Sequence, residues 1–232
     1  MTKATRILDF YRNVDFDGEL PDNIHLLNPY KENLEIRDSV DQFYNKYYND
    51  EKPRHLILGI NPGRLGAGAT GIPFTDTKRL QDICKIPVIG KTTHEPSSVF
   101  VYEMIDAFGG PELFYGHFYI NSVCPLGFVK KSGEKLVNYN YYDSQLLTSV
   151  VSQFIIENIG HQIDIAEKAD VCFCLGAGKN FQYLNKINQK HLFFNEIVPL
   201  EHPRYIMQYK SSFKQRYIDD YLVKLQKVLQ YR

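Results

Sequence analysis

Four short apolar runs, separated by segments with helical spacing, constrain the fold of this chain more than any other feature. The runs are residues 55–60, 117–123, 170–176 and 192–198. Short apolar runs bounded by turn residues are typical of buried strands, and helices between strands are typical of parallel crossovers. The pattern therefore predicts a three-layer α/β/α fold around a central, mostly parallel four-stranded sheet.

The segments around these runs predict the helices. Helical spacing covers residues 98–108, 143–155 and 178–187, and a last helix is expected to begin at Ser211 or Ser212. The first fifty residues carry two more helical patterns, which are expected to decorate the body. A length of 232 residues suits a single domain that spans the whole chain.

Composition narrows the function classes. The formal net charge is zero, which does not suggest a general polyanion binder, although residues 201–232 hold seven basic and three acidic side chains. No apolar run approaches the roughly 20 residues of a membrane span, and the N-terminus lacks a secretory signal. A cytoplasmic protein without membrane contact is therefore expected. The four cysteines lack metal-ligand spacing and are expected to be buried free thiols.

Ligands bind at the carboxyl ends of the strands in parallel sheets of this kind. Three chemically rich loops are expected at that edge, after Ile60, after Ile120 and after Val198. The first loop, residues 59–77, contains a GxGxxG pattern. We reject a dinucleotide site because the pattern starts six residues beyond the strand and Pro73 interrupts any helix after it.

These loops present side chains that suit a flat, polar ligand. Asn61 ends the first strand, and Gly63 lets a ligand approach the backbone closely. Phe74 either anchors its loop in the core or stacks on the ligand. Asn121 either forms a turn or pairs with an amide-like edge such as that of uracil. His202 is either a structural histidine or a donor to an anionic oxygen.

The three loops together resemble the motifs of the uracil-DNA glycosylase superfamily. GINPG with a downstream TGIPF, then NSVCPL, then HP ahead of a basic segment, is most similar to the single-strand-selective monofunctional uracil-DNA glycosylase family. The order and spacing cover roughly residues 55–215. The resemblance implies the fold of that superfamily. It also implies hydrolysis of the N-glycosidic bond of uracil, or of another deaminated base, in single- or double-stranded DNA.

Carried over by position, the resemblance assigns catalysis to Asn61, which would position water, and to His202, which would contact O2 of the base. Phe74 becomes the stacking platform and Asn121 the reader of the pyrimidine edge, while Gly63 leaves room near C5. The implied substrate site is completed by Gly59, Ile60 and Pro62.

Two positions depart from the motifs of that family. The last motif reads HPRYIMQYK in place of HPSPRN, and Phe74 is followed by Thr75 and Asp76 in place of glycine. The last segment is still expected to contact DNA, with Ile206 and Met207 either as an apolar wedge in the base stack or as core residues. The expected DNA contacts are Arg204, Tyr205, Ile206, Met207, Lys210 and Ser211.

The implied chemistry needs neither a metal nor an organic cofactor. A neutral amide cannot act as a base, so Asn61 would orient water while His202 stabilises the anion that develops on the departing base. No lysine in the three motifs is placed as a Schiff-base nucleophile, which predicts a monofunctional enzyme without strand cleavage. The alternative is a non-catalytic nucleic-acid or nucleotide-binding module on the same fold. A monomer is expected.

Overall fold

The computed structural model describes residues 1–88 and 92–230. At its centre lies a four-stranded sheet, all parallel, in the order β3-β2-β6-β7. Its strands are β2 (His55–Gly59), β3 (Phe118–Ser122), β6 (Val171–Leu175) and β7 (Glu196–Leu200). Every residue of β2 and β3 is buried, as expected for strands that are covered on both faces.

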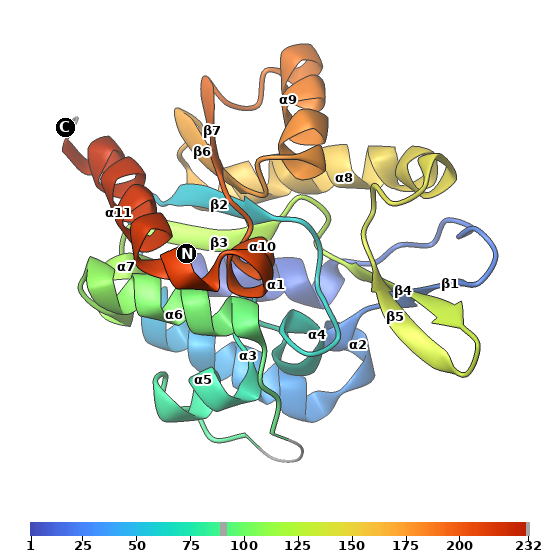
Figure 1. The fold of residues 1–232 in the computed structure, drawn as a ribbon, viewed down its shortest axis with the longest axis horizontal. Coiled ribbons are helices and arrows are strands. Elements are labelled where there is room, and N and C mark those ends of the chain that lie inside the picture. Colours follow the sequence, from blue (N-terminus) through green and yellow to red (C-terminus); the bar gives the residue numbers. More distant parts are fainter. Residues whose placement is uncertain (89–91, 231–232) are drawn as a thin grey trace.

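Helices cover both faces of this sheet. One layer contains α8 (Gln145–Ala166) and α9 (Lys179–His191). The opposite layer contains α1 (Lys3–Asn13), α3 (Leu34–Tyr47), α6 (Pro96–Phe108) and α7 (Pro111–Tyr115). Figure 1 shows the sheet between these two layers, which confirms the predicted three-layer α/β/α fold.

Some predicted boundaries are wrong. The long helix α8 is capped by Ser144, whose hydroxyl accepts from the Leu147 N–H, and not by Asp143. The fourth strand was expected at residues 192–198 but begins at Glu196. The reason is that α9 continues to His191 and ends on Leu192 in a left-handed conformation, so the first apolar residues of that run belong to the helix end.

A second, antiparallel sheet was not predicted. It has the order β1-β4-β5 and is built from β1 (Ile24–Leu27), β4 (Gly127–Ser132) and β5 (Lys135–Tyr139). Most of β5 is exposed, so it lacks the apolar alternation that identifies a half-buried strand. This sheet joins the N-terminal region, which also holds α2 (Pro29–Glu32), to the segment that follows β3.

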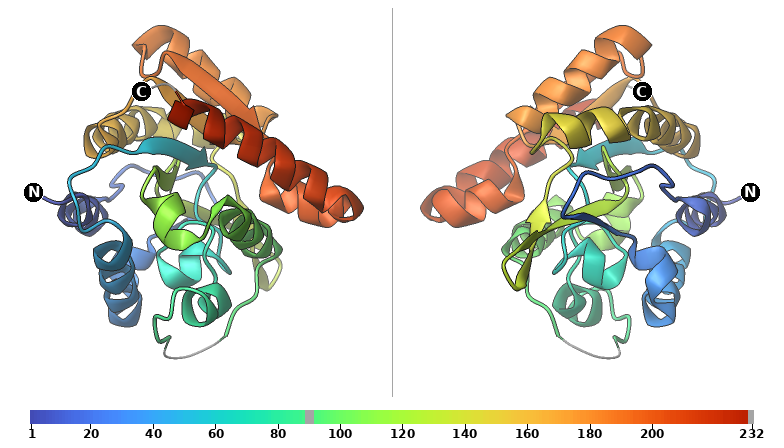
Figure 2. Two further views of the ribbon diagram at one scale, coloured as in Figure 1. Left: turned by 90° about the vertical axis from the view of Figure 1, so that its left-hand side faces the viewer. Right: turned by 90° about the vertical axis from the view of Figure 1, so that its right-hand side faces the viewer.

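The C-terminal region contains one helix more than expected. A short helix, α10 (Pro203–Tyr209), and a 3₁₀ turn at Ser211–Phe213 precede the long helix α11 (Lys214–Gln230). Figure 2 shows α10 and α11 on the side of the molecule opposite to the N-terminal helices. The N-terminal helices α1 and α3 therefore lie away from α10.

Two expectations from composition concern the whole chain. All four cysteines are free and buried, as predicted. Among the described residues, no helix combines the length and the apolar character that crossing a membrane requires.

Candidate active site

A cavity of about 430 Å³ opens where the loops after β2, β3, β6 and β7 meet. A volume of this size suits a small, flat ligand. Eight of the residues singled out from the sequence line it, namely Ile60, Asn61, Pro62, Gly63, Phe74, His202, Arg204 and Tyr205. The fold thus brings the first and last loops together, although they are about 140 residues apart in the sequence.

The side-chain amide of Asn61 is held at both ends. Its Oδ1 accepts from the Tyr141 N–H at 3.1 Å, and its Nδ2 donates to the carbonyl oxygens of Tyr139 at 3.2 Å and Pro62 at 3.3 Å. These partners fix which end of the amide is oxygen and which is nitrogen. Because an amide oxygen has two lone pairs, Oδ1 keeps one acceptor position for a water molecule.

His202 is a neutral hydrogen-bond donor in this site. It precedes α10, and its Nδ1 accepts from the Arg204 N–H at 3.1 Å, which places the ring proton on Nε2. Burial, and then the charge of Arg204, lower the pKa of His202 to about 3. Nε2–H has no hydrogen-bond partner among residues 1–88 and 92–230, so it remains available to a ligand.

Phe74 both anchors its loop and lines the cavity. Its ring is partly buried against the core, and its centroid lies 5.8 Å from that of His202 with the planes at 49°. The backbone of Phe74 has a φ of 54°, which is unusual for a large side chain. A Cβ on Gly59 would lie 2.7 Å from this ring. Gly59 therefore serves the site by making room for Phe74.

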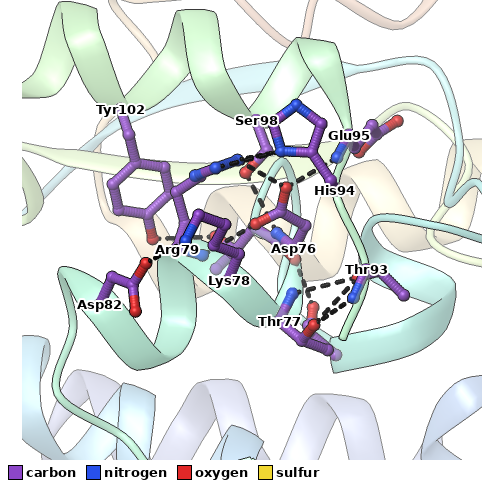
Figure 3. A network of polar contacts seen from close by, with 12 residues as sticks. Asp76, Thr77, Lys78, Arg79, Asp82, Thr93, His94, Glu95, Ser98 and Tyr102 are labelled. Carbon is purple, nitrogen blue, oxygen red and sulfur yellow. Dashed lines mark hydrogen bonds and ion pairs between the residues drawn. The ribbon is translucent and has the colours of Figure 1, made fainter. Parts of the chain in front are cut away.

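A buried network of hydrogen bonds and an ion pair holds the segment that follows Phe74. Asp76 is fully buried and accepts from the Arg79 N–H at 2.8 Å, from Nη1 of Arg79 at 3.0 Å and from the Glu95 N–H at 2.7 Å. Arg79, on α5 (Thr77–Asp82), also contacts Nδ1 of His94 at 3.0 Å. Figure 3 shows how this network ties the end of the Phe74 loop to the start of α6.

The side chain of Glu95 leaves that network and forms a charged part of the cavity wall. Its Oε1 lies 3.9 Å from Nη2 of Arg204. Burial raises the pKa of Glu95, and the charge of Arg204 only partly opposes this. A Cβ on Gly66 would lie 2.1 Å from Oε2 of Glu95, so a glycine of the rejected GxGxxG pattern serves packing.

The structure does not bring Asn121, which is predicted to read the pyrimidine edge, into the cavity wall. The side chain of Asn121 is buried outside the cavity, where Nδ2 donates to the Tyr119 hydroxyl at 2.9 Å and Oδ1 accepts from the Ser122 N–H at 2.8 Å. Successive residues of a strand face opposite sides, so the neighbouring Ser122 lines the cavity instead.

The two apolar residues considered for a wedge, Ile206 and Met207, are not exposed in the structure. Because residues 203–209 are helical, Ile206 turns inward and is fully buried, while Met207 is partly buried against the core. The exposed aromatic side chains of this helix are Tyr205 and Tyr209, whose ring centroids lie 5.7 Å apart and which both line the cavity. Of the remaining predicted DNA contacts, Lys210 is partly buried and Ser211 is exposed, and neither lines the cavity.

A fourth loop contributes to the cavity and was missed. It follows β6 and reads GAGKN, and all five of its residues, 176–180, line the cavity. Gly176 has a φ of 114°, which a side chain would rarely allow. Lys179 thus lies at the site, although no lysine was expected there. A glycine-rich turn and a lysine directly after a predicted strand were the signals that could have identified it.

Part of the chain is similar in sequence to proteins named single-strand selective monofunctional uracil-DNA glycosylase. The chain is 30% identical over 98 residues to the single-strand selective monofunctional uracil-DNA glycosylase of Rattus norvegicus. The match covers 35% of this chain and 35% of the relative. It is 28% identical over 98 residues to the protein of that name from Bos taurus, covering 35% of this chain and 36% of the relative. The alignments thus span about a third of the length of these curated relatives.

A solved structure matches almost the whole chain. The crystal structure of wild-type Pedobacter heparinus SMUG2 matches this structure with a TM-score of 0.97 and covers 99% of each chain. The two sequences are 53% identical. The uracil DNA glycosylase superfamily matches residues 45–226, a range that holds every residue lining the cavity. Since the match extends over most of the sequence, the chain belongs to the uracil DNA glycosylase superfamily.

Proposed function

We propose that this chain is a monofunctional DNA glycosylase, which hydrolyses the N-glycosidic bond of uracil in DNA and so initiates base excision repair. Its superfamily and the names of its relatives support this activity. The observation that carries the proposal is that one cavity holds the fixed amide of Asn61, the ring of Phe74 and a neutral His202 with a free N–H.

His202 would stabilise the departing base. As the glycosidic bond breaks, negative charge develops on O2 of uracil while the sugar becomes oxocarbenium-like. A donor that is already in place at that oxygen is worth about 2.7–4 kcal/mol in comparable sites. The Arg204 N–H donates to Nδ1, so the proton of the neutral imidazole lies on Nε2. Nε2 can therefore donate directly to O2 of the base.

Asn61 would direct water to the sugar. A neutral amide does not ionise, so its contribution is to accept a hydrogen bond from water and to orient the oxygen toward the anomeric carbon. No strong base is needed if the leaving group departs early, because the resulting cation reacts readily with water. Phe74 would stack on the base and hold it in the cavity.

The DNA strand would cross the mouth of the cavity. Arg204 and Lys179 are cations that line the cavity and suit phosphate contacts. The base must leave the stack, which costs a few kcal/mol and is easiest for a mispaired or single-stranded nucleotide. We assign the exposed rings of Tyr205 and Tyr209 to the gap in the stack, in place of Ile206 and Met207.

Base release from a defined oligonucleotide tests this proposal. Purified protein should release free uracil from a uracil-containing strand in EDTA and leave sites that break only after alkali treatment. The Asn61→Ala variant, purified in the same way, excludes a contaminating glycosylase. Binding without release of uracil would instead indicate a non-catalytic module. Strand scission without alkali, with borohydride trapping that depends on Lys179, would show that the enzyme is not monofunctional.

A further inference from the structure

The amide of Asn61 belongs to a closed ring of hydrogen bonds that reaches into the core. Tyr141 donates its backbone N–H to Oδ1 of Asn61 at 3.1 Å and its hydroxyl to Oδ1 of Asn180 at 2.8 Å. Asn180 in turn donates from Nδ2 to the carbonyl oxygens of Gly59 at 3.2 Å and Leu175 at 3.0 Å. Since Gly59 lies two residues before Asn61, the ring closes on itself.

The ring connects three parts of the fold. Gly59 and Leu175 are the last residues of the adjacent strands β2 and β6, and Asn180 lies in the first turn of α9. Tyr141 follows the β4–β5 hairpin, which ends at Tyr139. A position defined by two strand ends and a helix is more rigid than one defined by a loop alone.

Because these residues are buried, each polar group in the ring needs its partner within the protein. Tyr141 is fully buried and Asn180 is 1% exposed, so a missing partner for either could not be replaced easily by water. The carbonyl of Tyr141 is also fixed, because it accepts from Oγ1 of Thr148 on α8 at 3.0 Å. Both backbone groups of Tyr141 and its hydroxyl are therefore engaged.

We propose that Tyr141 and Asn180 are positioning residues for Asn61, and that the ring holds the water-orienting amide at a fixed angle to the cavity. The inference rests on the proposed role of Asn61 in catalysis. An amide that is free to rotate would present Oδ1 and Nδ2 alternately, and only Oδ1 can accept from water. Loss of alignment in a reacting group reduces the rate without removing any contact to the substrate.

The Tyr141→Phe variant tests the ring because it deletes one hydroxyl and keeps the backbone N–H. Its matched control is Tyr183→Phe, since the ring of Tyr183 lies 4.9 Å from that of Tyr141 but its hydroxyl donates to Ser152. We expect Tyr141→Phe to reduce the single-turnover rate of uracil release about 10-fold, with unchanged affinity for an uncleavable analogue. The control should stay within about twofold of wild type.

A double-mutant cycle separates positioning from a merely structural role. In an Asn61→Ala background the effect of Tyr141→Phe should fall to less than about twofold, because the amide to be positioned is gone. The same 10-fold loss in both backgrounds, an equal loss in the Tyr183 control, or an unchanged rate in Tyr141→Phe would each overturn the inference. If wild type itself releases no uracil, the proposed function fails instead.

A second variant covers the case in which Tyr141→Phe does not fold. Thr148→Val keeps the shape of the side chain and removes only the bond to the Tyr141 carbonyl and the local bond within α8. We expect a loss of about threefold in the single-turnover rate, again dependent on Asn61. A melting temperature close to that of wild type, together with an unchanged rate, would contradict the positioning role.

Discussion

The two walls of the cavity are built differently. At the strand ends, the side chains of Asn61 and Asn180 are bound at both ends by neighbouring groups. On the wall formed by α6 and α10, Glu95 and Arg204 are 3.9 Å apart, and Tyr209 is 65% exposed. In the first wall both ends of these two amides are held by protein groups, whereas the second wall presents charged and aromatic groups to the cavity.

This difference suggests a division of labour. Groups that act in the transition state gain from being fixed before the substrate arrives. Groups that bind DNA can instead exchange a weak internal partner for a phosphate or a base. We therefore expect substitutions in the strand-end wall to change the rate of the chemical step, and substitutions in the α6–α10 wall to change the affinity for DNA.

The largest effect is expected from His202→Ala, although this residue adjoins α10. The single-turnover rate should fall about 10²-fold or more, as for other oxyanion donors, with little change in the affinity for an uncleavable analogue. His191→Ala, at the exposed end of α9, is the matched control. A histidine pKa near 6.5 for His202 in an NMR titration of the free protein would contradict the burial that lowers this pKa to about 3.

Phe74→Ala should have the next largest effect. Loss of base stacking is expected to weaken binding of an uncleavable uracil nucleotide by about 1–3 kcal/mol. Phe74→Tyr should preserve most of that binding, and Phe213→Ala, an exposed aromatic outside the cavity, should preserve all of it. Fluorescence titration measures the three affinities. Equal affinities for wild type and Phe74→Ala would leave Phe74 only as an anchor of its loop.

Loss of the two exposed tyrosines of α10 should affect activity on duplex DNA more than activity on single-stranded DNA. Replacing Tyr205 and Tyr209 together by Ala is expected to reduce uracil release from a duplex about 10-fold more than release from a single strand, because only a duplex has a stack to hold open. Comparing rates on the two substrates measures this. An equal loss on both would assign these rings to strand binding and not to the gap in the stack.

Glu95→Gln should have the smallest effect on activity and a measurable one on stability. Because burial raises its pKa, the ionised carboxylate destabilises the folded state at neutral pH. Below the unfolded pKa, about 4.3, the carboxyl is protonated in both states and this cost disappears. Urea unfolding should therefore find the variant more stable than wild type at pH 7, with the difference shrinking as the pH falls toward 4.

The glutamine variant also tests whether Glu95 acts as a base. We assign the chemistry to the strand-end wall. The single-turnover rate of Glu95→Gln should therefore stay within about twofold of wild type. A loss of 10²-fold would move general-base catalysis to Glu95 and would break the division between the two walls.

The sequence predicted best those features that lie within one continuous segment. The buried runs of β2, β3 and β6 and the loop from Asn61 to Phe74 were placed correctly because apolar burial and turn residues are local signals. Asn121 lies outside the cavity wall and its neighbour Ser122 lines it, since which strand residue faces a cavity depends on tertiary packing that motif spacing does not contain.

Other parts of the site depend on contacts between distant segments. The bond from Tyr141 to Asn61 spans 80 residues and starts from a hairpin with a weak strand pattern. The sequence could not decide whether Ile206 is a wedge residue or a core residue, because the answer depends on residues 203–209 being helical. In both cases the local sequence allowed two structures, and packing against the rest of the chain selected one.

The most direct test of the central claim compares Asn61→Ala with Arg204→Ala, measuring the single-turnover rate at saturating enzyme and the dissociation constant on one uracil-containing strand. Lys52→Ala, at the opposite end of β2, is the control. Asn61→Ala should lose about 10²-fold in rate and keep its affinity. Arg204→Ala should keep its rate, bind more weakly and lose roughly one unit of salt dependence. If both variants lose rate and affinity in the same proportion, the two walls do not have separate roles.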